Sequence, residues 1–233
     1  MELPSPDELR RRLDELRGHR GYLLPHHGAL AAAAPDLHAA YLRMYEALTL
    51  TDRHLDAFER EFVWLAVLAA TKEAVGTHHL DLFRRAGGTD EQAKAAFQLA
   101  GYAGAADIFA FVEEAWSDFL PSLDARASYW DGVATLLRDR VPQQIAILAL
   151  TAVHAVNGSH WGVAAQIEAA YAACIAEEKL AEALSLIIWP VGVNKFLDAC
   201  TTWHDLMGAG RVHPSPRFQA WADTPAQGRF EPD

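Results

Sequence analysis

The sequence predicts an all-α fold, and three observations support this prediction. Helix-start signals recur, as at Ser5-Pro6-Asp7-Glu8, where a serine N-cap precedes a proline at the first helical position and an acid that completes a capping box. Apolar residues recur at steps of three and four, the spacing of one helical face. No stretch alternates between apolar and polar residues as a half-buried strand does, and Asn157-Gly158 lies between alanine-rich helical segments rather than between β-branched runs.

Helices account for the N-terminal part of the chain, residues 1–54, and for the segment that follows it. Pro35-Asp36 opens a helix whose apolar side chains recur at helical spacing: Leu37, Tyr41, Met44, Tyr45 and Leu48. The next helix is expected over residues 55–71. Its run 62–70 is apolar on every face, so this helix has to be buried on all sides.

Two later segments repeat the same bulky residues at a constant spacing. One begins at Gly87-Gly88 and ends at Trp116, and the other begins at Cys174-Ile175 and ends at Trp203, 87 residues further on. The same offset pairs Glu91 with Glu178, Tyr102 with Trp189 and Phe109 with Phe196. Upstream, residues 62–67 resemble residues 145–150, with a few more residues in the second copy. Alanine-rich helices can resemble one another by chance, but the equal spacing favours a tandem duplication of helical hairpins that pack pseudo-symmetrically, with copies at 55–120 and, degenerate, at 142–205.

The remaining segments connect or follow these copies. Residues 121–141 are expected to be a linker with one short amphipathic helix. Residues 206–233 are expected to form an extended tail, because prolines and glycines exclude helix there: Pro214, Pro216, Pro225 and Pro232. Aromatic residues in this tail indicate that it wraps a surface of its own or of a neighbouring subunit: Phe218, Trp221 and Phe230.

The composition fits a globular protein in the cytoplasm. The chain has 233 residues, of which 51% are apolar, enough to bury a core. Twenty Lys and Arg against thirty-one Asp and Glu give a net charge of −11, which disfavours a nucleic-acid partner. Two cysteines cannot form a disulfide framework, so a reducing compartment is expected. The start of the chain lacks a targeting signal, and the most apolar run, 145–156, falls short of the ~20 residues that span a membrane.

Several of these residues stand in an order that resembles a known family. They are Ala34-Pro35-Asp36-Leu37, Arg60-Glu61-Phe62, His79 and Ala86-Gly87-Gly88-Thr89-Asp90-Glu91. Together they are similar to the carboxymuconolactone decarboxylase and alkylhydroperoxidase D superfamily, over about residues 34–116 and more weakly over 142–203. The resemblance implies an all-α fold, often with tandem copies, and a homo-oligomer, for which a trimer of duplicated chains is favoured.

One branch of that superfamily uses a dithiol, which this sequence lacks. Alkylhydroperoxidase D-like members carry Cys-x-x-Cys-x-x-x-His, because the chemistry needs an activated thiolate and a resolving thiol. In the first copy, Lys72 and Val75 stand at the cysteine positions. In the second copy, Ser159 and Gly162 stand there, and Gln166 stands at the histidine position. Neither copy is therefore expected to run a dithiol cycle.

The decarboxylase branch implies a small organic acid or lactone as substrate and no cofactor. By the resemblance, His79 is the proton carrier, with Glu73 or Glu61 orienting it. Arg60, Arg84 or Arg85 would hold the acid group. Gly76-Thr77 is expected to break the helix, with Thr77 as the N-cap of the next one, so that His78 and His79 lie in its first turn.

The other histidines and tryptophans have simpler interpretations. His78 is expected to face solvent or a subunit contact. The lining of a pocket or the core is expected for His154, His160 and Trp161, and core packing is expected for Trp64. The remaining histidines are expected at a surface or an interface: His19, His26, His27, His38, His54, His204 and His213. His78 and His79 are adjacent, and His154 and His160 are six residues apart across an expected Asn157-Gly158 turn, so neither pair has the spacing of a helical metal site and no metal is expected. Two alternatives to the decarboxylase stay open: a protein that lost dithiol chemistry and serves a binding or assembly role, and an enzyme of different chemistry, with or without a metal, that reuses the pocket.

Overall fold

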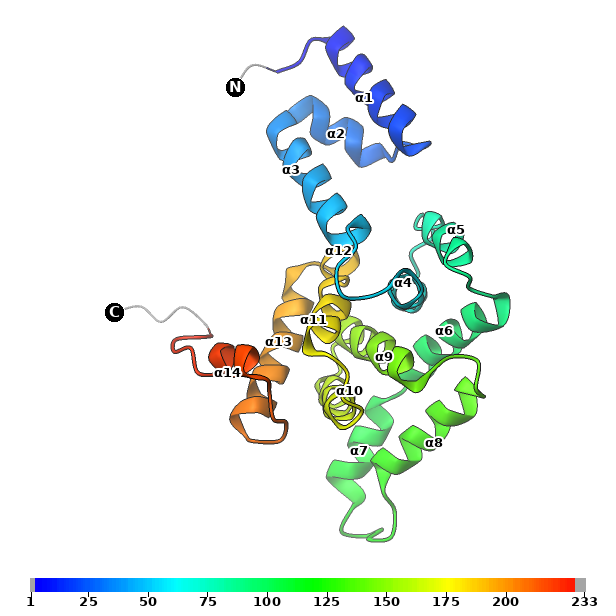
Figure 1. Cartoon of the computed structure of the whole chain (residues 1–233), viewed down its shortest axis with the longest axis vertical. Helices are drawn as coiled ribbons and strands as arrows, with labels where there is room; N and C mark the ends of the chain where they lie inside the picture. The colour runs from blue at the N-terminus through cyan, green and yellow to red at the C-terminus, as the bar shows by residue number, and fades with distance from the viewer. Residues whose placement is uncertain (1–2, 229–233) are drawn as a thin grey trace. The chain divides into compact units, whose positions relative to one another are not determined.

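The computed structural model describes residues 3–228, and its contacts divide the chain into two compact units, residues 1–51 and 52–233. Residues 3–228 are predominantly helical and contain no β-strand (Figure 1). The predicted all-α fold is therefore confirmed.

The first unit consists of three α-helices and a short π-helix. These are α1 (Pro6–Arg20), α2 (Pro25–Ala33), α3 (Pro35–Tyr45) and η1 (Glu46–Leu50). The predicted N-cap of α1 is confirmed, because the Ser5 side chain accepts a hydrogen bond from the backbone N–H of Glu8 at 3.3 Å, but the capping box is not formed and the Glu8 carboxylate pairs with Arg12. Each α-helix begins with a proline, whose missing N–H costs nothing in the first turn.

Two histidines lie in the interior of this unit. His27 is 1% exposed and His38 is 9% exposed, and His27 Nδ1 lies 3.1 Å from His38 Nε2. The expectation that both are surface or interface residues is wrong, because α2 and α3 bring the two rings together. Arg20 Nη1 lies 3.0 Å from His27 Nε2, and because a guanidinium can only donate, His27 Nε2 is the acceptor. The proton of the neutral His27 ring is therefore on Nδ1, which donates a hydrogen bond to His38 Nε2. Burial, then the neighbouring His26, Arg20 and His38, lower the pKa of His27 to about 4.

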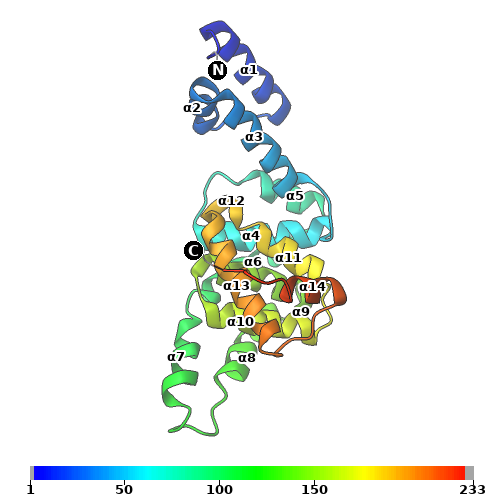
Figure 2. The same ribbon diagram turned by 90° about the vertical axis from the view of Figure 1, so that its left-hand side faces the viewer.

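The second unit is built around two long apolar helices, α4 (Ala57–Thr71) and α9 (Gln143–Asn157), which pack against each other. The prediction of a fully buried helix over residues 62–70 holds for 62–67, which are at most 1% exposed. The remaining helices cover this pair: α5 (His78–Arg85), α6 (Asp90–Ala103), α7 (Asp107–Trp116), α8 (Ala125–Leu137), α10 (His160–Ala172), α11 (Glu177–Ser185), α12 (Ile188–Val191), α13 (Val193–Gly208) and α14 (Pro216–Ala222). Figure 2 shows α7 and α8 side by side at one end of this unit.

The two predicted copies turn at corresponding positions. Gly87 and Cys174, 87 residues apart, both have left-handed backbone angles (φ 88° and 53°). The next residue closes the same hydrogen bond in both: Gly88 N–H to Phe83 O and Ile175 N–H to Ala170 O, each at 2.9 Å. Such a closure is the usual C-terminal motif of a helix.

The offset is smaller at the two long helices. Each has 15 residues and ends at a left-handed residue, Lys72 after α4 and Gly158 after α9, which are 86 residues apart. The match of residues 62–67 to 145–150 gives an offset of 83 residues, whereas the ends of the two helices give an offset of 86. With this offset, Ala146 and Ile147 correspond to Arg60 and Glu61.

The segment that leads into each long helix is anchored by a helix of the other predicted copy. Glu182 on α11 accepts hydrogen bonds from the backbone N–H groups of His54 (2.7 Å) and Leu55 (2.9 Å), just before α4. Reciprocally, Gln92 on α6 donates to the carbonyl of Arg140, just before α9, at 3.2 Å. The two segments therefore depend on each other at their starts.

The linker and the tail differ in part from expectation. The helix predicted within residues 121–141 is α8, and it contributes to the core through Tyr129 and Val133. The prediction that prolines exclude helix after residue 206 is wrong, because α13 continues to Gly208 and α14 has Pro216 in its first turn. Phe218 and Trp221 pack on Trp203 with ring centroids 5.2 and 5.5 Å away, so this part of the tail covers the chain's own surface. Pro232 and Phe230 lie outside the described residues.

One stretch of the described chain, Asp90–Trp116, is long and apolar enough to cross a membrane by length and composition. Core helices of soluble proteins pass the same test, so a single such stretch is weak evidence for a membrane span. Here the stretch is divided between α6 and α7 by a turn, and α6 buries Ala95, Ala96 and Leu99 in the core.

Candidate functional site

The turn after α4 places two histidines at the start of α5. Lys72 ends α4 in the left-handed conformation, and α5 begins at His78 with Thr77 at the N-cap position. The predicted break and the placement of both histidines in the first turn are confirmed, although the Thr77 side chain makes no capping hydrogen bond.

His79 forms a buried pair with Glu61. His79 Nδ1 lies 2.7 Å from Glu61 Oε2, and the two residues are 2% and 1% exposed. The second Glu61 oxygen accepts from Nε of Arg60 at 3.2 Å, and Arg60 Nη1 donates to Asp52 at 2.6 Å. The indole of Trp64 stacks on the His79 ring at 4.4 Å between centroids, with the planes 19° apart. The imidazole is therefore held by a carboxylate at its edge and an indole on its face.

This arrangement fixes which nitrogen of His79 is available for chemistry. With Glu61 ionised, Nδ1 carries a proton and donates it to Oε2, and Nε2 is then the nitrogen that takes up or releases a proton. A carboxylate in this position orients the ring and stabilises its cationic form, as it does in enzymes where histidine is the acid or base.

The three arginines predicted to hold a substrate acid are all paired with carboxylates. Arg60 is paired with Asp52 and Glu61, as described above. On the surface, Arg84 is 2.7 Å from Asp90, and Arg85 is 2.7 Å from Asp81.

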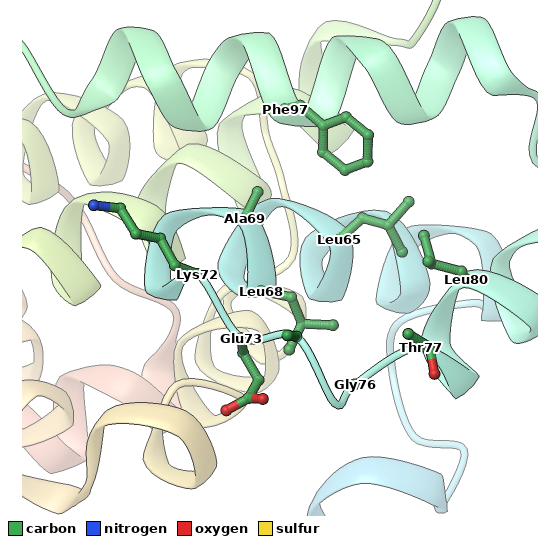
Figure 3. Close-up of a pocket in the computed structure, with 10 residues that line it drawn as sticks. Leu65, Leu68, Ala69, Lys72, Glu73, Gly76, Thr77, Leu80 and Phe97 are labelled. Atoms are coloured by element: carbon green, nitrogen blue, oxygen red, sulfur yellow. The ribbon is translucent and has the colours of Figure 1, made fainter.

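Glu73 lies apart from the Glu61–His79 pair. It is exposed, and its Oε1 accepts from the backbone N–H of Val75 at 2.9 Å. It lines a pocket of about 270 Å³ between α4, α5 and α6, whose other lining side chains are largely apolar (Figure 3). His78 is partly buried, with its ring centroid 4.1 Å from that of His79.

In the second predicted copy, the buried histidine has a different partner. His154 Nε2 lies 2.8 Å from the hydroxyl of Tyr129, and Gln166 Nε2 lies 3.5 Å from the same hydroxyl; all three residues are fully buried. Burial lowers the pKa of His154 to about 4, and Asp107 opposes this shift more weakly. Gln166 occupies the place of His79 at the 87-residue offset, and Ile147 that of Glu61 at the 86-residue offset, so no acid–imidazole pair forms there.

The other predicted pocket residues lie elsewhere. His160 and Trp161 line an open pocket of about 480 Å³ between α10 and α13. His160 is exposed, with Nδ1 3.1 Å from Thr202 Oγ1, and the Trp161 indole donates to Glu113 at 3.0 Å. The structure thus places His154 in the core and His160 with Trp161 at the surface.

Two residues of these polar clusters had no functional prediction. Trp64 follows Glu61 by three residues on one helix, so helical spacing alone places both on the same face. Tyr129 lies in the predicted linker, and no local pattern indicates that it reaches the core.

The described residues show no group of three or more His, Cys, Asp or Glu side chains arranged to hold a metal ion. Both cysteines are free: Cys174 is exposed and Cys200 is partly buried. Burial raises the pKa of the Cys200 thiol to about 11, which is opposite to what a reactive thiol needs.

Comparison with known proteins agrees with the resemblance found in the sequence. Residues 35–115 match the model of the carboxymuconolactone decarboxylase family. No match to the chain was found among curated proteins or among solved structures. The resemblance is therefore confirmed over residues 35–115, and that of residues 142–203 stays a prediction.

Proposed function

Residues 35–115 belong to the carboxymuconolactone decarboxylase family, and from this premise we propose that the protein is a cofactor-independent decarboxylase or lactone-type enzyme acting on a small organic acid. His79 is the proton carrier and Glu61 the residue that orients it. The observation that supports this proposal is the 2.7 Å contact between the His79 imidazole and the Glu61 carboxylate.

The pair suits the proton step of a decarboxylation. When the bond between the α-carbon and the carboxylate breaks, CO₂ leaves and the electron pair stays on the carbon, which then takes a proton. A cationic His79 gives that proton from Nε2 and becomes neutral, with Nδ1–H still donated to Glu61. Positioned acid–base groups of this kind contribute about 10²- to 10⁴-fold to a rate.

The second copy is proposed to have lost this proton step. The corresponding helix turns at 87 and 174 support a tandem duplication, in which Ile147 and Gln166 stand in place of Glu61 and His79. We also propose a cytoplasmic homo-oligomer, for which the family resemblance favours a trimer, with a small molecule rather than nucleic acid or a membrane as its partner.

A binding or assembly role without catalysis is the second candidate. His79 is only 2% exposed and does not line the pocket between α4, α5 and α6. In that case the Glu61–His79 pair would serve to join α5 to α4.

Measurement of CO₂ release tests the proposal. Wild-type protein is incubated with carboxymuconolactone and a panel of small lactone and β-keto acids, beside His79→Gln and Glu61→Gln. We expect turnover of at least one acid and a loss of about 10²- to 10⁴-fold in kcat for His79→Gln. The control is His213→Gln, an exposed histidine outside both pockets, which should keep full activity.

Two results would contradict the assignment. A folded His79→Gln protein with undiminished turnover removes the proton role. Absence of CO₂ release from every acid of the panel favours the binding or assembly role instead.

A further inference from the structure

We propose that the first unit opens in acid: when the buried pair of His27 and His38 takes up protons, α2 separates from α3. This proposal does not rest on the proposed function, because it involves neither His79 nor Glu61. Three observations carry it. The hydrogen bonds of the pair require neutral rings, the charged groups around the pair are cations, and the pair supplies two of the five buried side chains of this unit.

The hydrogen bonds of the pair leave no place for a further proton. Arg20 donates to His27 Nε2 at 3.0 Å, and His27 Nδ1–H donates to His38 Nε2 at 3.1 Å. A proton added to His27 goes onto Nε2 and faces the guanidinium of Arg20. A proton added to His38 goes onto Nε2 and faces the N–H of His27. Either event replaces a buried hydrogen bond by two donors that face each other, so these bonds exist only while both rings are neutral.

The titratable groups around the pair supply positive charge and no negative charge. They come from α1 and the turn after it, from α2 and from α3: Arg20, Tyr22, His26, His38, Tyr41 and Tyr45. The tyrosines are neutral at any pH below about 10. In the described chain, neither Arg20 nor any of the three histidine rings is paired with a carboxylate. An imidazolium formed here therefore has no counter-charge, in contrast to His79 beside Glu61.

The guanidinium of Arg20 is held close to the pair. It donates to the hydroxyl of Tyr22 at 2.9 Å, and it lies over the ring of Tyr45, 4.3 Å from the centroid. The ring of His26 lies on another side, 4.2 Å from that of His27. Burial, followed by the charges of these neighbours, lowers the pKa of His27 to about 4, and burial lowers the pKa of His38 as well. Both shifts agree with the geometry.

The first unit has too small a core to lose this pair. Five side chains of residues 3–51 are buried, and besides the two histidines they are Ala31, Tyr45 and Thr49. A unit of this length has little stability to lose, because it buries a small share of its surface. Such a unit can open locally at a lower free energy than unfolding of the whole protein requires. Protonation should therefore open the first unit while the second unit stays folded.

The opening would act on a helix of the matched family segment. The match begins at residue 35, so α3 belongs to it, whereas α2 precedes it. His38 of α3 is thus held by a ring from outside the matched segment. Release of α3 from α2 is the change that acid would bring to the matched segment.

Amide hydrogen exchange on the full chain, corrected for the intrinsic effect of pH on exchange, measures this opening. The quantity is the protection of the backbone N–H groups of residues 38–45 at pH 7 and at pH 5. The open unit binds more protons than the closed one below pH 6.5, so its population rises as the pH falls. With a pKa of about 4 in the closed unit and 6.5 in the open unit, His27 alone predicts a loss of about 20-fold in protection.

Two matched variants assign this loss to the pair. His27→Gln and His154→Gln each replace a buried histidine whose pKa is about 4, one in each unit. A glutamine at position 27 can still accept from Arg20 and donate to His38, but it cannot take up a proton. His27→Gln should therefore remove most of the loss at residues 38–45, whereas His154→Gln should leave it at about 20-fold.

The proposal is overturned if the wild type shows equal protection of residues 38–45 at pH 7 and pH 5, or none at either pH. It is also overturned if His27→Gln is protected at pH 7 and then loses as much as the wild type. Should His27→Gln lack protection at pH 7, the NMR signals of the His27 ring in the wild type decide. We expect the closed unit to keep a neutral ring at pH 5.5, and a protonated ring in the closed unit would contradict the proposal.

Discussion

The two buried imidazoles of residues 52–228 differ in the partner that each one faces. His79 is 2.7 Å from a carboxylate, Glu61, and His154 is 2.8 Å from a phenol, Tyr129. A carboxylate compensates the charge of an imidazolium, whereas a phenol only supplies or accepts a hydrogen bond. Burial therefore restricts His154 to its neutral form, while His79 lies where its cationic form is compensated.

The predicted duplication places the two rings at different positions of its copies. At the 86-residue offset it pairs His154 of α9 with Leu68 of α4, and at the 87-residue offset it pairs His79 of α5 with Gln166 of α10. Under this prediction the two imidazoles are not counterparts of each other.

Removal of the carboxylate gives the largest expected effect. Glu61→Leu leaves Nε of Arg60 and the N–H of His79 without their acceptor in a buried place, which should lower the free energy of unfolding by about 3–5 kcal/mol. The matched change in the other segment, Ile147→Leu, keeps the volume and should cost under ~1.5 kcal/mol. Urea unfolding measures both. Equal losses would show that the Glu61 charge is not compensated by these contacts.

Acid should destabilise the protein through His154. Its pKa is about 4 in the fold against 6.5 in the unfolded chain, so the unfolded chain binds more protons between these values. As the pH falls from 6.5 toward 4, the free energy of unfolding should decrease by on the order of 3 kcal/mol because of His154. His154→Gln should make the free energy of unfolding depend less on pH than it does in the wild type. Both proteins retain His27, whose contribution is similar, so the difference between them reports on His154 alone. An unchanged slope would contradict the neutral state of His154.

Two glycines in close contact with neighbouring side chains test the packing around these residues. A Cβ on Gly162 would lie 2.2 Å from Nδ1 of His154, a ring held in place by Tyr129, so Gly162→Ala should cost about 2–3 kcal/mol. A Cβ on Gly76 would lie 2.8 Å from the end of the Leu68 side chain, which can move, so Gly76→Ala should cost under ~1 kcal/mol. Thermal unfolding of both variants measures the difference, and a reversed order would mean that His154 is free to turn.

Removal of the phenol hydroxyl should cost less than the loss of the Glu61 carboxylate or the crowding at Gly162. Tyr129→Phe takes away the partner of His154 Nε2 and of Gln166 in a fully buried place, at a cost of about 1–2 kcal/mol. The proposed CO₂ release should be unaffected, because this cluster belongs to the second segment. A loss of turnover comparable to that of His79→Gln would mean that the two clusters act together.

Much of the fold could be predicted because it depends on local patterns. The apolar run of α4, the caps of α1 and the break before His79 all follow from residues within a few positions of one another. The sequence left open whether Glu61 or Glu73 is the partner of His79, because the geometry of the turn between α4 and α5 decides which carboxylate faces the imidazole. The structure brings Glu61 to His79 across 18 residues and leaves Glu73 exposed.

Contacts between distant elements account for what the sequence did not reveal. The pairing of His27 with His38 depends on how α2 and α3 pack, and that of Tyr129 with His154 joins α8 to α9. The pairing of Arg60 with Asp52 likewise depends on a contact across eight residues, and it neutralises a guanidinium that was expected to bind an acid.

The reciprocal anchoring of the two segments bears on where this protein can be divided. Glu182 fixes the chain before α4, and Gln92 fixes the chain before α9, so each half supplies hydrogen bonds that the other half needs to begin its central helix. We therefore expect the end of the family match at residue 115 not to be a boundary of folding. We expect a chain cut between α7 and α8 to give two complementary fragments that each need the other to fold, and a mutation in the segment without the acid–imidazole pair to weaken the segment that has it.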